Sequence, residues 1–372
     1  MNNKTYTKRA VRYDGRRSVA ELPLGGIGTG TLTLDCKGRI KDIEIFNRPA
    51  KDLTPPYNFF SIYARAAGEE GRAMILERRL TPPYSQARGY HPGRVAGLPR
   101  FAHSAMRIEY PFAYVELQDE SMPVSVDLKA FNPFVPLDAD ASGIPAVVFR
   151  YEVTNRTEKP VDVTVCGSFC NTLMNRGFDA FDNFLTEPKN RNEYFDAGAF
   201  RGIAFSTAEE FRGELKYGTL ALTTREQNVT HKATWLHRGW WDGAEDFWRD
   251  FSADGLLEAE SHYAADGKTG GPDGYRVGSL GVCKTIAPHA SETFEFAFSW
   301  CIPNRIRCWC EDAPVEENGT VRNYYAVKFG DAKGAASYLW ERLDRLESLS
   351  EAFREALFTS AYDRSVIEAF AS

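Results

Sequence analysis

Residues 146–165 read AVVFRYEVTNRTEKPVDVTV, and this stretch is the clearest guide to the fold. Apolar side chains occupy every second position from Val147 to Val153, and valines alternate again from Val161. Side chains two residues apart lie on the same face of a strand, so each half predicts a strand with one buried face. The turn-rich segment 155–160 predicts that the two strands form an antiparallel hairpin.

The same alternation recurs elsewhere, for example from Val124 to Leu128 and from Phe294 to Phe298. Aromatic and β-branched residues suit a half-buried pleated surface. Many such strands with polar turns between them predict a mainly β fold, a large antiparallel sandwich of two sheets. Residues 170–200 are rich in Asn, Asp, Phe and Gly, and we expect a long excursion loop there.

The last part of the chain changes to helical periodicity. After Asp331, apolar residues follow at the spacing of one helix face and include Leu339, Leu343 and Leu346. This pattern predicts an amphipathic helix whose apolar stripe is covered by the sandwich. Asp331 is its candidate N-cap.

Further apolar residues with helical spacing follow in the C-terminal part. They are Phe353, Leu357, Phe358, Val366, Ile367 and Phe370. A large exposed apolar surface normally marks a contact with a partner, so these residues are expected to belong to a further domain. The alternative is that they fold back and complete the sandwich core. We therefore expect a β-sandwich over residues 1–328, then a helical linker and the truncated start of a catalytic barrel over residues 329–372.

Composition limits the function classes. The net charge of −6 and the lack of basic runs argue against a nucleic-acid partner. No apolar stretch approaches 18 residues and the N-terminus has no apolar core of a signal peptide, so we expect neither a transmembrane segment nor secretion. Seven scattered cysteines favour reduced thiols and a cytoplasmic location.

The glycine-rich segment 25–30, GGIGTG, invites comparison with a dinucleotide-binding loop. Its spacing differs from G-x-G-x-x-G, and the residues after it alternate like a strand. Without a helix N-terminus there is no row of amides for a pyrophosphate. We interpret Gly28 and Gly30 as residues that shape the backbone, and we expect no cofactor.

Three cysteines lie close together, at Cys301, Cys308 and Cys310. Their C-x6-C-x-C spacing matches no usual zinc pattern, and the nearest histidine is His289. We expect thiols without a metal ion.

An aromatic stretch from Trp235 to Phe251 contains Trp240, Trp241 and Asp242. Indole rings beside carboxylates are typical of sugar sites, because the ring stacks on the pyranose and the acids accept from its hydroxyls. The alternative is a short amphipathic helix, since Phe247 and Phe251 are four residues apart.

Residues 22–30, LPLGGIGTG, and 39–49, RIKDIEIFNRP, resemble the N-terminal domain of glycoside hydrolase family 116. This is the family of non-lysosomal glucosylceramidases and bacterial β-glucosidases. Weaker matches keep the family's order along nearly the whole chain: VFRY at 148–151 with TN at 154–155, DFW at 246–248 with FSADG at 251–255, PNR at 303–305 and NYYA at 323–326.

The resemblance implies a sandwich, a linker helix and then an (α/α)6 barrel that carries the catalytic carboxylates. No residue here matches the family's catalytic motifs, so no catalytic residue is carried over, and the chain is expected to end as the barrel begins. Among 51 acidic residues, no local signature raises one pair above the rest for the two-carboxylate chemistry of glycosidases.

We therefore predict a non-catalytic module of a retaining β-glucosidase-like or glucosylceramidase-like enzyme. It would shape or support the barrel, supplied in cis or in trans, and border a site for a β-glucoside or glycolipid sugar. The alternatives are a free-standing carbohydrate-binding or scaffold protein that uses Trp240 and Trp241, and a complete enzyme with its own carboxylate pair. The candidate substrate-rim or domain-interface residues are Asn47, Arg48, Trp240, Trp241 and Asp242.

Overall fold

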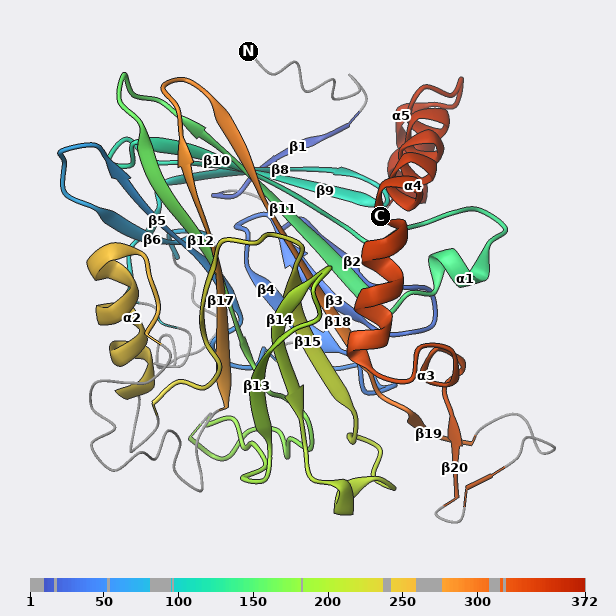
Figure 1. Ribbon diagram of the computed structural model, residues 1–372. Coiled ribbons are helices and arrows are strands. Elements are labelled where there is room, and N and C mark those ends of the chain that lie inside the picture. The colour runs from blue at the N-terminus through green and yellow to red at the C-terminus, as the bar shows by residue number, and fades with distance from the viewer. Residues whose placement is uncertain are drawn as a thin grey trace.

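The computed structural model describes residues 10–16, 19–51, 54–80, 95, 97–181, 183–236, 242–258, 276–307, 315–316 and 319–371. Two sheets pack face to face, and helices contact their outer sides (Figure 1). Helix α4 (Ala332–Phe358) contacts the larger sheet, and helix α2 (Asp242–Asp254) contacts the smaller one. The prediction of an antiparallel, mainly β fold with C-terminal helices is confirmed.

The larger sheet has nine antiparallel strands. In order across the sheet they are β1 (Arg12–Asp14), β8 (His103–Glu109), β9 (Phe112–Gln118), β10 (Val124–Phe131), β11 (Ala146–Asn155), β18 (Ser291–Cys301), β15 (Thr219–Thr224), β14 (Arg201–Ser206) and β13 (Arg191–Asp196).

The smaller sheet has six strands, antiparallel except for its last pair. In order they are β16 (Val229–Lys232), β17 (Val277–Ile286), β12 (Val161–Cys170), β5 (Phe59–Ala66), β6 (Arg72–Arg78) and β7 (Arg100–Phe101).

Short elements complete the fold. They are a three-stranded sheet of β2 (Glu21–Leu24), β3 (Thr31–Asp35) and β4 (Ile40–Glu44), the pair β19 (Asn304–Ile306) and β20 (Thr320–Arg322), and the helices α1 (Ala139–Ser142), η2 (Glu209–Phe211), α3 (Tyr324–Phe329) and α5 (Arg364–Ala371). None of the helices in the described ranges has the length and hydropathy needed to cross a membrane.

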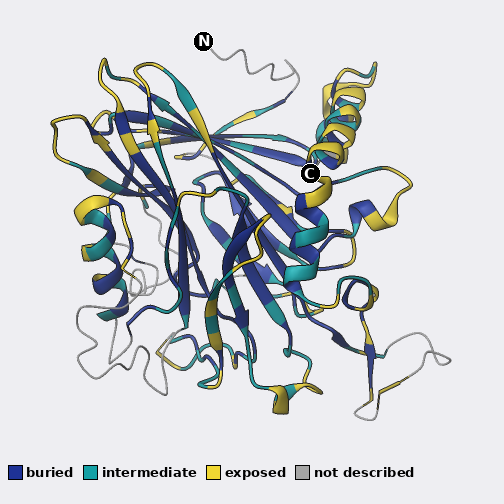
Figure 2. Cartoon of the chain, viewed as in Figure 1, coloured by how far each residue is buried: buried dark blue, intermediate teal, exposed yellow. Residues whose placement is uncertain are grey.

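The core between the sheets is centred on Phe60 of β5. Its ring centroid lies 4.9 Å from that of Tyr151, 5.1 Å from that of Phe149 and 5.2 Å from that of Phe296, all on the larger sheet. These side chains occupy the alternate positions that the sequence predicted to be buried. Figure 2 shows the buried residues concentrated in the strands.

The predicted hairpin within residues 146–165 is wrong. Strand β11 pairs with β10 and β18 in the larger sheet, while β12 pairs with β5 and β17 in the smaller one. The link between β11 and β12 therefore crosses from one sheet to the other. The buried Asn155 amide donates to the carbonyl oxygens of Lys159 (2.8 Å) and Ile286 (3.1 Å) at this crossing. Alternation indicates which face of a strand is buried, but it does not identify the neighbouring strand.

The predicted excursion loop over 170–200 is only partly correct. Residues 171–190 connect β12 to the edge of the larger sheet without a regular strand, apart from one bridge between Phe178 and Phe184. The following residues form β13, which pairs with β14. Its polar residues, including Arg191 and Glu193, suit an edge strand, where one side of the backbone has no neighbouring strand.

The apolar stripe of α4 is buried against the larger sheet, as predicted. Leu339 and Leu343 are fully buried and Leu346 nearly so, in contact with a cluster that includes Val148. Val148 lies on the opposite face of β11 from Phe149, so both faces of this strand are covered at that end. Asp331 is confirmed as the N-cap, because its Oδ1 accepts from the Gly334 amide at 2.7 Å.

The residues after Leu346 divide between core and surface. Phe358 and Ile367 are buried together with Ala10, so the C-terminal segment folds back onto the start of the described chain. Val366 and Phe370 on α5 remain exposed. The hypothesis of exposed stripes and the alternative of a folded-back tail each describe part of this segment.

The glycine-rich segment between β2 and β3 is packed against other loops. The Gly25 amide donates to the Asn132 side chain at 3.0 Å, and the buried Trp300 indole donates to the Thr29 carbonyl at 2.7 Å. Gly28 and Gly30 have φ values of +73° and +95°, a region that L side chains rarely adopt. Strand β3 follows directly, which agrees with the interpretation of this segment as a structural loop.

Replacing Gly28 and Gly30 in turn should distinguish backbone strain at positive φ from steric clash of the added side chain. A Cβ on Gly30 would lie 2.6 Å from the Glu44 carbonyl oxygen, whereas a Cβ on Gly28 would have no atom within 4 Å. We expect Gly28→Val to cost about 1 kcal/mol for its φ, and Gly30→Val to cost at least about 1 kcal/mol more because the backbone must also move. Urea unfolding measures both, and equal losses would contradict the packing described for Gly30.

Candidate functional site

Three segments that are distant in the sequence meet at a junction of three asparagine residues. We call Asn47, Asn304 and Asn323 the asparagine junction. The Asn47 Nδ2 donates to the Asn304 carbonyl oxygen at 3.2 Å, and its Oδ1 accepts from the Asn323 Nδ2 at 3.1 Å. Asn47 follows β4, Asn304 begins β19 and Asn323 precedes α3. The junction therefore joins the three-stranded sheet to the pair of β19 and β20 and to the start of the C-terminal helices.

The two buried asparagines of the junction also fix nearby backbone. Asn304 donates to the carbonyl oxygens of Arg212 (2.8 Å) and Glu214 (2.9 Å), in the turn before β15. Asn323 donates to the Ile302 carbonyl at 2.8 Å. Buried polar groups need such partners, because an unpaired buried group costs about 1–3 kcal/mol. The junction thus holds four segments in one arrangement.

The outer side of the junction carries positive charge. Arg48 is exposed, and the half-buried Lys216 lies in the turn that Asn304 holds. Lys216 Nζ donates to the Asn175 carbonyl oxygen at 2.6 Å and to its Oδ1 at 3.0 Å. Burial lowers the pKa of Lys216, and repulsion by Arg48 lowers that pKa further.

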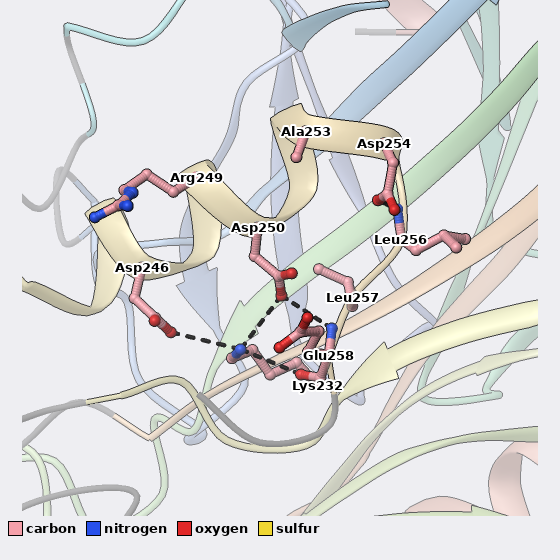
Figure 3. Close-up of a pocket in the computed structure, with 9 residues that line it drawn as sticks. All are labelled: Lys232, Asp246, Arg249, Asp250, Ala253, Asp254, Leu256, Leu257 and Glu258. Atoms are coloured by element: carbon pink, nitrogen blue, oxygen red, sulfur yellow. Dashed lines mark hydrogen bonds and ion pairs between the residues drawn. The ribbon is translucent and has the colours of Figure 1, made fainter. Parts of the chain in front are cut away.

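A second polar cluster lies beneath α2 (Figure 3). Lys232 at the end of β16 is only 1% exposed, and its Nζ lies 3.3 Å from the Asp250 Oδ2 and 3.5 Å from the Asp246 Oδ2. It also donates to the Glu258 carbonyl oxygen at 3.2 Å. These residues line a hollow of about 480 Å³ that Arg249 and Asp254 also border. We call Lys232, Asp246 and Asp250 the α2 ion cluster.

The α2 ion cluster explains how the helix is held on the sheet. Two carboxylates from α2 neutralise one buried ammonium group from β16, and a buried cation requires such partners. Beside it, the Phe247 ring stacks on the buried Trp235 with centroids 4.4 Å apart, and Phe251 is fully buried. The alternative of a short amphipathic helix, raised from the spacing of Phe247 and Phe251, agrees with α2.

The structure separates the predicted site residues. Asn47 belongs to the asparagine junction, and Arg48 is exposed beside it. Asp242 is the first residue of α2, which lies on the opposite side of the molecule from β19 and β20 in Figure 1. Trp240 and Trp241 lie outside the described residues, as do Cys308 and Cys310. Cys301 is buried, and no group of three or more metal-binding side chains occurs within the described ranges.

The residues that contact one another at the junction come from stretches that resemble one enzyme family. The family model described as "beta-glucosidase 2, glycosyl-hydrolase family 116 N-term" matches residues 22–346, which is most of the chain. The chain belongs to glycoside hydrolase family 116. The match covers both sheets except β1, the asparagine junction and α4 as far as Leu346, so this family 116 domain includes the first part of its C-terminal helix.

Three solved structures share general features with the family 116 domain at low similarity. One is named as a kojibiose phosphorylase from the human microbiome (9% identity, TM-score 0.37, covering 95% of this chain and 32% of that one). Another is the polysaccharide lyase BACCELL_00875 (10%, 0.32, 77% and 32%). The third is named as an aldose 1-epimerase from Escherichia coli K12 (10%, 0.32, 76% and 99%). The chain spans about a third of the first structure, and at these TM-scores the likeness carries no argument about function.

Sequence reasoning missed two of the lysines described above. Lys216 stands in the segment FRGELKYG, which matches no motif, and Lys232 ends a short edge strand. The only available signal for Lys232 was the pair Asp246 and Asp250, four residues apart on one helix face. Asn304 and Asn323 did carry a signal, because both lie in stretches that resemble the family.

Proposed function

We propose that this domain is the non-catalytic module of a β-glucosidase-like or glucosylceramidase-like family 116 enzyme, and that it supports an (α/α)6 catalytic barrel in cis or in trans. The observation that carries the proposal is the asparagine junction. The three asparagines come from three family-like stretches, and their hydrogen bonds hold these stretches together at one surface. Such an arrangement is suited to presenting a rigid contact surface.

The surroundings of the junction support a contact role. Apolar side chains stand exposed next to two of its asparagines: Ile306 on β19, and Tyr324 and Val327 on α3, the last two 69% and 66% exposed. Exposed apolar groups rimmed by polar ones are typical of protein–protein contacts. The partner that fits the family is the catalytic barrel, with a β-glucoside or glycolipid sugar as its substrate. The odd number of cysteines, of which the five described are free thiols, supports a cytoplasmic location for the enzyme.

The contact role is testable by mixing this chain with a separately produced family 116 barrel. Val327→Glu should weaken their association by about tenfold or more, because a charge would be buried in an apolar contact. Val19→Glu is the matched control, since Val19 is also an exposed valine but lies between β1 and β2. Calorimetry measures both variants, and an unchanged affinity for Val327→Glu would remove α3 from the contact.

The non-catalytic role predicts that the chain alone does not hydrolyse 4-nitrophenyl β-glucoside above the rate in buffer. Glycosidase catalysis lowers the barrier by about 8 kcal/mol or more and requires two placed carboxylates. The release of nitrophenol measures the rate. A turnover that one Asp or Glu substitution in this chain abolishes would overturn the proposal.

A further inference from the structure

Two cations beside the asparagine junction stand on segments that the fold brings together. Lys216 Nζ lies 6.0 Å from the centroid of the Phe46 ring, two residues before Arg48. The turn that carries Lys216 is fixed by Asn304, and the loop that carries Arg48 is fixed by Asn47, which bonds to Asn304. The same hydrogen bonds that build the junction therefore bring together the two segments that carry these positive charges.

No carboxylate neutralises this pair within the described parts of the chain. The ion pairs found there within 4.0 Å include neither Arg48 nor Lys216, although most cations around the sandwich have an acidic partner. The hydrogen bonds of Lys216 go to two neutral oxygens of Asn175. Repulsion by Arg48 disfavours the charged form of the half-buried Lys216, and a bound anion would offset this cost.

We propose that Arg48 and Lys216 form a binding site for one oxyanion, a carboxylate or a phosphate group. An ammonium group has three N–H donors, and Asn175 accepts from two of those of Lys216, which leaves one for a ligand. The exposed guanidinium of Arg48 offers parallel donors that match the oxygens of either group. This site would recognise the negative charge of its ligand, whereas a sugar site recognises a pyranose ring by stacking an aromatic side chain on it. The oxyanion comes from a free phosphorylated small molecule, or from an Asp or Glu side chain of a bound protein.

The test is a titration of the whole chain with inorganic phosphate, and separately with N-acetylglutamate as a stand-in for a protein carboxylate. Nuclear magnetic resonance of the Lys216 ammonium and of nearby amides reports binding at the site itself. We expect saturable shifts, together with a rise in the pKa of Lys216, because an adjacent anion favours the charged form. Tighter binding of phosphate indicates a small-molecule ligand, and tighter binding of the carboxylate indicates a protein side chain.

Variants make the assignment specific. Arg48→Met should weaken the binding of the anion by about tenfold or more. The substitution should leave folding intact, because Arg48 is exposed and makes no ion pair within the described residues. Lys216→Met should do the same, whereas Lys216→Arg should retain binding if the chain tolerates the larger group. The control is Lys333→Met, because Lys333 is also half-buried over an aromatic ring, with its Nζ 5.3 Å from the Phe195 centroid. Unsaturable shifts, or an affinity that Arg48→Met leaves unchanged, would overturn the proposal.

Discussion

Replacing Arg354 by methionine is expected to lower the free energy of unfolding by about 3–5 kcal/mol, the usual loss when one partner of a buried ion pair is removed. Arg354 on α4 donates from a guanidinium nitrogen to the Glu109 Oε2 at 2.8 Å, and the Glu109 side chain is completely buried. Without the guanidinium, the buried carboxylate at the end of β8 would lose this ion pair. Chemical denaturation followed by circular dichroism measures the loss.

Two further variants test the cause. Arg345→Met removes an exposed arginine from the same helix and should change stability by no more than about 0.5 kcal/mol. The double substitution Glu109→Gln with Arg354→Met should regain part of the loss, because it also removes the buried negative charge. If Arg354→Met costs less than about 1 kcal/mol, water must reach Glu109 and α4 is held differently from the arrangement described.

The ion pair between Arg354 and Glu109 alters the expected effect of trimming the C-terminal segment. A tail belonging to another domain could be trimmed after residue 347 at little cost, but that cut would remove Arg354 and the buried Phe358. It would also remove Glu351, whose carboxylate lies 2.5 Å from the Lys129 ammonium group of β10. We therefore expect the trimmed chain to lose several kcal/mol, about what the buried pair alone contributes. The exposed Val366 and Phe370 do not contribute to this expected loss of stability.

The second large effect is expected from Lys232→Met. Removing the ammonium group leaves Asp246 and Asp250 close together beneath α2, with their side chains 5% and 12% exposed. We expect a loss of about 3–5 kcal/mol in the free energy of unfolding, and a loosened α2. Hydrogen exchange of the α2 amides, together with the denaturation midpoint, measures both effects.

The matched control is Lys159→Met. Lys159 pairs with Glu69 at 2.7 Å, but both side chains are more than half exposed, so its loss should cost about 0–1 kcal/mol. Substituting Asp250→Asn together with Lys232→Met should restore part of the stability by removing one of the two carboxylate charges. A small effect of Lys232→Met with α2 still protected would mean that Phe247 and Phe251 alone hold the helix.

Features with a local period could be predicted from the sequence. The strands around Phe149 and Phe296, their buried faces and the helix that begins after Asp331 all repeat every two or every three to four residues, and periodicity determines which face is apolar. The positive φ of Gly28 and Gly30 was also foreseeable, because only glycine adopts such backbone without cost.

The pairing of strands and the composition of the site were decided by the tertiary structure. Residues 146–165 look like a hairpin, yet their two strands lie in different sheets, because alternation specifies a buried face and leaves the neighbouring strand open. Asn47 bonds to residues 257 and 276 positions later, and these bonds link the loop of Arg48 to the turn of Lys216. Hydrogen bonds between such distant residues leave no periodic trace in a single sequence. The sequence by itself determined the strands with clear alternation, the helix after Asp331 and the family, while folding determined which polar side chains meet.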